Sequence, residues 1–152
     1  DILKDSKYVI TPTADTSSES LESYVQLIKD MKAVPVIMDY KEHDYTVAAI
    51  SHVPHLIAAG LTRTVKTNDD DEKHMHLLAA GGFRDTTRIA ASSPEMWSQI
   101  CNSNKDSICI FLDKFIEEMH NIRDNISNDT PEETSEFIEN LFKEAGGYRK
   151  SF

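Results

Sequence analysis

The segment YTVAAISHVPHLIAAGLTRTV, residues 45–65, sets the architecture that we expect of this chain. Its apolar residues recur around most of a helical circumference, which is typical of a central helix buried on several sides. The pattern stays helical from about residue 40 onward, so the sequence predicts a mainly α fold with this segment as its hub. Pro54 removes a backbone donor and crowds the carbonyl of Ile50, and we expect the helix to kink there.

Two histidines interrupt this apolar segment, in the stretch SHVPH at residues 51–55. His52 and His55 are three residues apart and would share one helical face. Imidazoles can donate to a carboxylate, hydrogen-bond a keto oxygen or shuttle protons near neutral pH. A pair of satisfied core histidines accounts for the pattern equally well.

The stretch AAGGFRDTTR, residues 79–88, sets two arginines beside a glycine pair. A guanidinium fork fits a carboxylate or phosphate bidentately, and glycine lets backbone N–H groups approach a ligand. Arg84 and Arg88 are four apart and would share a helical face, which favours an anion site. Alternatively, both arginines pair with carboxylates of this acidic chain. We expect a short helix over residues 74–80 that the glycine pair ends.

The C-terminal third carries two further helical patterns. A segment from about residue 105 to 127 has a coiled-coil-like stripe that suits packing within the monomer or between subunits. Its members are Ile108, Leu112, Phe115, Met119, Ile122 and Ile126. A capping box of Thr130 and Glu133 predicts a last helix that ends at Gly146 and Gly147. Its expected buried side consists of Phe137, Ile138, Leu141 and Phe142.

Composition limits the classes of partner. With 152 residues and 39% hydrophobic content, the chain suits one domain with a core. A net charge of −10 argues against nucleic acid or an anionic membrane surface as partner. Cys101 and Cys109 have no metal-binding spacing and need no disulfide, and neither a transmembrane run nor a signal peptide is expected. We therefore expect a cytoplasmic protein.

Taken together, SHVPH, LLAAGGFRDTTRIA and SSPEMW resemble the helical C-terminal domain of prephenate dehydrogenase, in that order and at compatible spacing. The similarity extends from KYVITPT to the final helices and covers nearly all of the chain. It implies an oxidoreductase of tyrosine biosynthesis that converts prephenate and NAD to 4-hydroxyphenylpyruvate, carbon dioxide and NADH.

The resemblance also implies a division of the chain. Residues 1–39 would form the terminal β-α-β part of a Rossmann-like dinucleotide-binding domain, with strands at 7–11 and 34–38. A capping-box pattern of Thr16 and Glu19 predicts the start of the intervening helix. Residues 40–152 would form a helical domain that binds substrate and makes a homodimer.

By the same resemblance, Arg88 anchors a substrate carboxylate with Arg84 nearby, and His55 binds the side-chain end of the substrate. Asp85 would orient an arginine or gate entry. The complete implied set of substrate-binding residues is His52, His55, Gly81, Arg84, Asp85, Arg88 and Trp97.

The dinucleotide loop of the family is not found in this sequence. The glycines Gly60, Gly81, Gly82, Gly146 and Gly147 do not form G-x-G-x-x-G. We therefore expect NAD and the general-base histidine to belong mainly to an absent N-terminal domain. No catalytic, cofactor-binding or metal-binding residue is assigned here, and the chain alone should be inactive.

Three alternatives stay open. The substrate could be arogenate in place of prephenate, with NADP in place of NAD and with tyrosine as an inhibitor. The chain could be a purely structural dimerisation module. A metal-dependent hydrolase could use His52, His55, His74 and His76, but these histidines have no acidic partner at a recognised metalloenzyme spacing.

Overall fold

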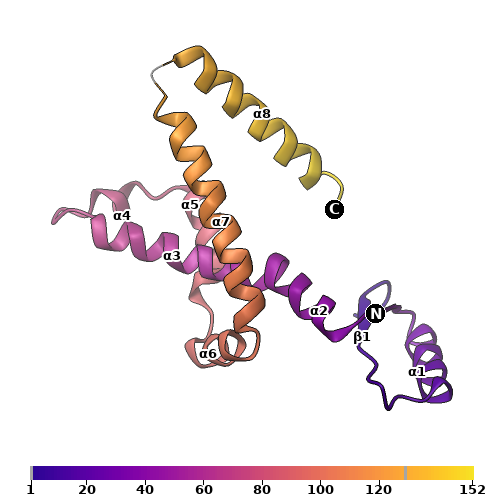
Figure 1. Ribbon diagram of the computed structural model, residues 1–152. Helices are drawn as coiled ribbons and strands as arrows, with labels where there is room; N and C mark the ends of the chain where they lie inside the picture. Colours follow the sequence, from indigo (N-terminus) through magenta and orange to yellow (C-terminus); the bar gives the residue numbers. More distant parts are fainter. Residues whose placement is uncertain (1, 129) are drawn as a thin grey trace. The chain divides into compact units, whose positions relative to one another are not determined.

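The computed structural model describes residues 2–128 and 130–152 and is mainly helical, which confirms the expected fold class (Figure 1). It separates into two compact units, residues 1–108 and residues 109–152. The strands are β1 (Lys7–Ile10) and β2 (Val34–Ile37). The helical elements are α1 (Ser18–Asp30), α2 (Tyr40–Val47), the π-helix η1 (Ala48–His52), α3 (Val53–Asn68), α4 (His74–Leu78), α5 (Gly81–Thr87), the 3₁₀ helix η2 (Arg88–Ala91), α6 (Pro94–Ser103), α7 (Lys105–Ile126) and α8 (Pro131–Arg149).

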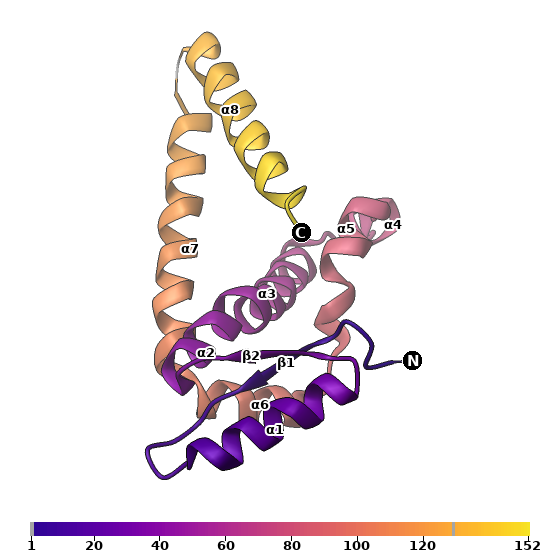
Figure 2. The same cartoon turned by 90° about the vertical axis from the view of Figure 1, so that its right-hand side faces the viewer.

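The predicted β-α-β piece is present at the start of the chain. β1 and β2 pair in parallel, with Lys7 opposite Val34 at one end of the register. Figure 2 shows α1 lying along the two strands. Ile28 of α1 is fully buried and forms a small core with Ile10 and Ala33.

The predicted cap of α1 is wrong. Ser17 is the N-cap, and its hydroxyl accepts from the backbone N–H of Ser20 at 3.1 Å. The Thr16 hydroxyl instead accepts from the N–H of Thr13 at 3.0 Å, in the turn before the helix. Thr16, Ser17 and Ser18 are successive hydroxyl residues, and each is a preferred N-cap type, so spacing alone could not choose among them.

The hub segment forms α2, η1 and α3 without a break. At η1 the backbone widens, because the N–H of Val53 bonds the carbonyl of Ala48, five residues earlier. Pro54 follows at once and has no N–H for the carbonyl of Ile50, so the helix widens to a π-turn just before the proline.

Burial of the hub is less complete than its composition predicts. α3 packs against η2 and α5, and Val53 and Ala58 are its buried residues. Ile50 stays 72% exposed and Leu61 stays 38% exposed. Much of the apolar surface of this segment is therefore uncovered within the part of the chain that the structure describes.

The prediction that the glycine pairs end helices is wrong at both places. Gly81 and Gly82 begin α5, and Gly146 and Gly147 lie inside α8, which continues to Arg149. A glycine ends a helix when it adopts a left-handed conformation, and none of these glycines has a positive φ.

α7 and α8 diverge from the turn that joins them in both views (Figures 1 and 2). The Thr134 hydroxyl donates to the carbonyl of Asn125 at 3.0 Å and ties the start of α8 to the end of α7. The predicted capping box is wrong, since the Thr130 side chain caps nothing and Glu133 accepts from the amide of Asn128 at 2.7 Å.

The apolar stripes of α7 and α8 are not buried within the described chain. Of the six stripe residues on α7, only Ile108 is buried, and Ile126 is 57% exposed. No described residue of α8 is buried, and Phe142 is 73% exposed, so the predicted buried side of this helix is wrong for the single chain. No helix in the described ranges is long and apolar enough to cross a membrane.

Candidate functional site

Three rings from α6 and the η1–α3 helix form a histidine–tryptophan cluster, which consists of His52, His55 and Trp97. The His55 imidazole stacks on the Trp97 indole, with ring centroids 4.3 Å apart and planes inclined by 30°. The His52 ring meets the same indole edge-on at 6.1 Å. The indole Nε1 is buried and has no hydrogen-bond partner among the described residues.

The position of Trp97 follows from the start of α6. Ser93 is the N-cap, and its hydroxyl accepts from the N–H of Met96 at 3.4 Å, while Pro94 occupies the first turn. A serine followed by proline and glutamate, Ser93-Pro94-Glu95, is the sequence pattern of a helix start, so the sequence predicts this cap and the structure confirms it. It sets the rotation of α6 and places Trp97 one turn along the helix.

His52 lies in a polar environment. The amide Nδ2 of Asn104 donates to the carbonyl of Asp44 at 2.7 Å and lies 3.3 Å from Nδ1 of His52. Burial lowers the pKa of His52, which the Asp44 charge opposes and the neighbouring His43 and His55 reinforce. The neutral form of His52 is therefore favoured.

The two histidines line different hollows. A hollow of about 200 Å³ lies against His55 and Trp97, with Leu56 and Ile89 among its apolar walls. A second hollow, of about 340 Å³, is lined by His52 together with polar groups of α2 and α6. Thus the predicted His52 and His55 share one indole but not one cavity.

Arg88 begins η2, whose next two residues, Ile89 and Ala90, line the hollow at His55. The structure therefore brings the element that carries Arg88 to His55, although these two residues are more than thirty positions apart in sequence. Arg88 is exposed and forms no ion pair with any described residue.

Arg84, Asp85 and Gly81 lie together on α5, one helix earlier. An Asp85 carboxylate oxygen lies 4.0 Å from the point that a Cβ on Gly81 would occupy, so this carboxylate sits over the first turn of α5. Neither Arg84 nor Asp85 forms an ion pair within the described ranges, and none of the three residues lines the hollow at His55.

Residues 39–143, more than half of the chain, match the family model described as prephenate dehydrogenase, dimerization domain. The chain belongs to this family. It is 38% identical over 142 residues to prephenate dehydrogenase of Bacillus subtilis, a match that covers 93% of this chain and 37% of that protein.

Two solved structures of the family share the fold. Prephenate dehydrogenase from A. aeolicus, in complex with hydroxyphenyl propionate and NAD+, matches with a TM-score of 0.83 and 28% identity over 93% of this chain and 50% of that one. Synechocystis arogenate dehydrogenase matches with a TM-score of 0.85 and 25% identity over 96% of this chain and 53% of that one. The chain thus spans about half or less of the length of these relatives.

Asn104 is a residue that sequence reasoning missed. It is the one buried polar side chain among the described residues, with 9% of its surface exposed. Its partners Asp44 and His52 lie 60 and 52 positions earlier in the sequence. The sequence did place Asn104 between two predicted helices, where asparagine often occurs. It did not indicate that Asn104 contacts a histidine.

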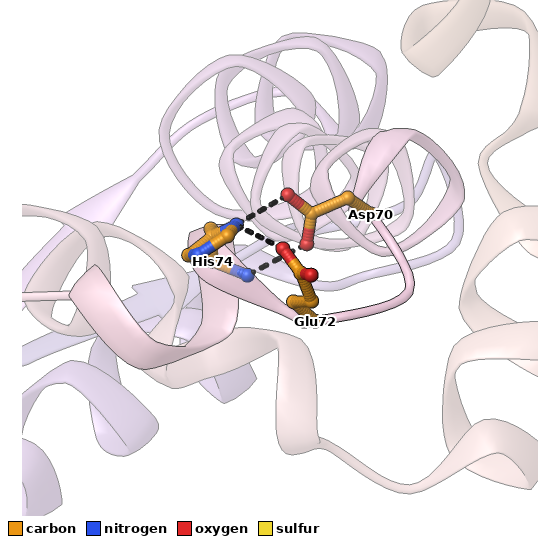
Figure 3. Close-up of side chains that lie close together, drawn as sticks. All are labelled: Asp70, Glu72 and His74. Atoms are coloured by element: carbon orange, nitrogen blue, oxygen red, sulfur yellow. Dashed lines mark hydrogen bonds and ion pairs between the residues drawn. The ribbon is translucent and has the colours of Figure 1, made fainter.

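The aspartate run and the histidines after it also meet in the structure (Figure 3). Asp70, Glu72 and His74 bring one ligand atom each to within 4.8 Å of one another, and all three residues are exposed. His74 therefore has acidic neighbours that the sequence spacing did not indicate.

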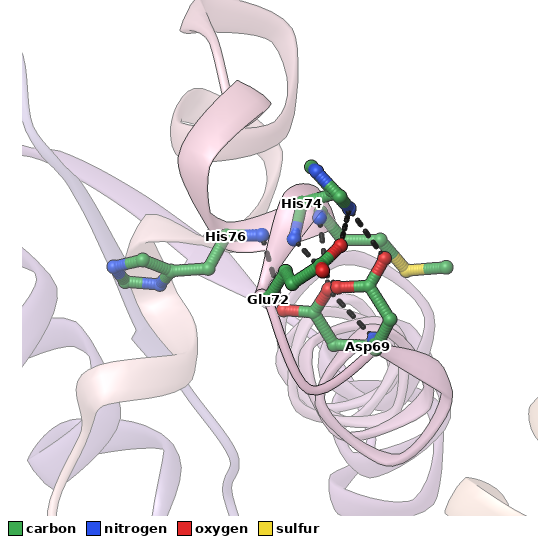
Figure 4. A network of polar contacts seen from close by, with 6 residues as sticks. Asp69, Glu72, His74 and His76 are labelled. Atoms are coloured by element: carbon green, nitrogen blue, oxygen red, sulfur yellow. Dashed lines mark hydrogen bonds and ion pairs between the residues drawn. The ribbon is translucent and has the colours of Figure 1, made fainter.

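The carboxylates of Asp69 and Asp70 bind backbone N–H groups at the start of α4 (Figure 4). Asp69 accepts from the N–H groups of Met75 at 2.8 Å and His76 at 3.2 Å, and Asp70 accepts from the N–H of His74 at 3.0 Å. The bonds from the backbone and ring of His74 lower the pKa of Asp70. Residues 69–76, which we call the capping turn, thus form the start of α4.

Proposed function

We propose that this chain supplies the substrate-binding and dimerisation part of an NAD-dependent prephenate dehydrogenase. The enzyme would convert prephenate to 4-hydroxyphenylpyruvate with loss of carbon dioxide, and its expected location is the cytoplasm. The observation that carries the proposal is the His55–Trp97 stack beside η2, in a chain whose family and fold are those of prephenate dehydrogenases.

The chemistry of the hollow suits a ring that carries anionic groups. Its apolar walls and the Trp97 indole can contact a six-membered ring, and the indole Nε1 is a buried donor without a partner among the described residues. Prephenate carries two carboxylates. Arg88 would bind one of them with a charge-assisted bond worth about 1.5 to 3 kcal/mol, with Arg84 nearby.

The histidines and α5 would complete the substrate contacts. His55 would bind the side-chain end of the substrate, and His52 would support the pocket from its own hollow. Gly81 would offer a backbone contact. Asp85 would orient an arginine or control entry of the substrate, without contacting the substrate itself.

NAD does not fit the residues of this chain. A dinucleotide needs a glycine loop at the start of a helix to hold its pyrophosphate, and the five glycines present do not form one. We therefore assign no NAD contact and no hydride or general-base step to these residues. NAD+ is bound in the A. aeolicus relative, which is about twice as long as the part matched here.

The same chain would form the homodimer. The stripes of α7 and α8 leave Ile126 57% and Phe142 73% exposed, and burying such side chains in a second copy would be favourable by about 25 cal/mol per Å² of apolar area. The description of the matched family as a dimerization domain supports this assignment. Light scattering at micromolar concentration should give the mass of a dimer, and a strict monomer with intact helices would remove the basis for it.

Arogenate is the second candidate substrate. Synechocystis arogenate dehydrogenase is as similar in fold as the prephenate enzyme, so the fold does not separate the two substrates. Calorimetric titration of the protein with prephenate, arogenate, 4-hydroxyphenylpyruvate and tyrosine would rank them. The proposal fails if none of the four binds.

Activity provides the complementary test. Mixed with prephenate and NAD, this 152-residue chain should give no NADH absorbance, because it holds no dinucleotide loop. Sustained NADH production, or tight binding of NAD, would overturn the division of labour proposed here.

A further inference from the structure

Asn104 joins two parts of the candidate site that are far apart in sequence. It follows α6, and its amide reaches the carbonyl of Asp44 on α2 and the ring of His52 on η1. A buried amide costs free energy unless its groups are bonded, so its position on these two partners is a strong local constraint.

The bond to Asp44 determines which way the amide faces. A backbone carbonyl can only accept, so the atom 2.7 Å from it must be the NH₂ group of Asn104 and not its oxygen. The same NH₂ group lies 3.3 Å from Nδ1 of His52. Nδ1 must therefore accept, and the single proton of a neutral His52 ring is on Nε2.

His55 has the opposite arrangement. Its Nδ1 lies 2.9 Å from the carbonyl of Ser51, one helical turn earlier. That oxygen can only accept, so Nδ1 of His55 carries a proton and the lone pair of the neutral ring is on Nε2. The two rings that contact Trp97 are thus opposite tautomers.

We propose that Asn104 is a positioning residue that holds His52 neutral with its proton on Nε2, so that the two rings beside Trp97 present opposite groups at Nε2: an N–H on His52 and a lone pair on His55. Protonation of His52 at Nδ1 would place two hydrogen-bond donors, this N–H and the NH₂ group of Asn104, opposite each other. Protonation of His55 at Nε2 keeps the bond to Ser51 intact.

The charged and titratable neighbours agree with this assignment. His43 and His55 disfavour a positive charge on His52, and burial lowers its pKa further, while Asp44 alone acts in the other direction. The part of the inference that concerns substrate rests on the proposed function: His55, and not His52, lines the hollow that prephenate would enter.

The test is the nitrogen NMR spectrum of the histidine rings in the ¹⁵N-labelled protein without ligand. His52→Gln and His55→Gln variants assign the two rings. We expect a protonated Nε2 and a bare Nδ1 in His52, and the reverse in His55. A protonated Nδ1 in neutral His52 would overturn the proposal.

Asn104→Asp tests the cause. A carboxylate has no donor and accepts from Nδ1, so the His52 proton should move to Nδ1 and its protonation should shift upward by about one pH unit or more. Asn102→Asp makes the same charge change at an exposed position on α6 and should leave both tautomers unchanged. An unaltered His52 spectrum in folded Asn104→Asp would show that Asn104 does not set the tautomer.

Added prephenate separates this inference from the proposed function. On binding, the signals of the His55 ring should change more than those of the His52 ring, because His55 lines the hollow, and the reverse result would overturn this placement of the substrate. If neither prephenate nor the other three ligands named above bind, the proposed function fails, while the tautomers measured without ligand still decide the role of Asn104.

Discussion

The capping turn and the histidine–tryptophan cluster both place histidine beside polar groups. They differ in whether those polar groups have hydrogen-bond partners. In the capping turn, all four carboxylate oxygens of Asp69 and Asp70 accept hydrogen bonds from residues of the same turn. In the cluster, a buried indole N–H has no partner in the described ranges, and a hollow lies beside it. Unmet bonding capacity beside a cavity indicates a ligand site, whereas satisfied carboxylates at a helix start indicate local structure.

The largest expected effect tests the ligand side of this comparison. Arg88→Ala should weaken prephenate binding by about tenfold to a hundredfold, because a charge-assisted bond of about 1.5 to 3 kcal/mol is lost. Arg88→Lys should restore only part of the affinity, since an ammonium cannot reproduce the bidentate fork. Calorimetric titration gives the affinities, and thermal unfolding should be nearly unchanged because Arg88 is exposed.

Asp69→Ala is the matched control from the capping turn. It carries a charge change of similar size but should leave prephenate affinity as it is. If Arg88→Ala binds as well as the unaltered protein, the arginine is not the anchor. If Asp69→Ala weakens binding as strongly, the contrast between the two regions is wrong.

The next effect concerns the stability of the capping turn itself. Asp69→Ala removes the acceptor for two backbone N–H groups and should destabilise the protein by about 1 kcal/mol. Asp69→Asn retains one acceptor oxygen and should lose only part of that. Urea unfolding followed by circular dichroism measures both, and equal stability of all three proteins would show that the turn is held by other contacts.

The same contrast explains how far the sequence could predict this molecule. Local patterns predicted the β-α-β start, the Ser93 cap and the long C-terminal helices, because spacing and capping chemistry act over a few residues. The glycine pairs were misread, since glycine permits a helix end without requiring one, and only the negative φ values settle the matter.

For the site, the sequence could predict residue types but not their partners. The family motifs pointed to His52, His55 and Trp97, and the structure brings these three rings together. Asn104 escaped because its bonds span more than fifty residues. The role of Asp69 escaped because a run of aspartates looks the same whether it is solvated or caps a helix.

The smallest expected effect is on the pH dependence of stability, to which the two regions contribute in different pH ranges. The pKa of His52 is lowered from 6.5, so its contribution to stability is complete above pH 6.5 and is lost as the pH falls through the lower value of the folded state. The pKa of Asp70 is lowered from 3.8, so its contribution persists until the pH falls below 3.8. Urea unfolding at a series of pH values, compared with His52→Gln and Asp70→Asn, isolates each group. The difference profile of His52→Gln should change just below pH 6.5 and that of Asp70→Asn only below 3.8. A flat profile for His52→Gln across that range would mean that the folded protein does not resist protonation of His52, and the cluster would then be as open to solvent as the capping turn.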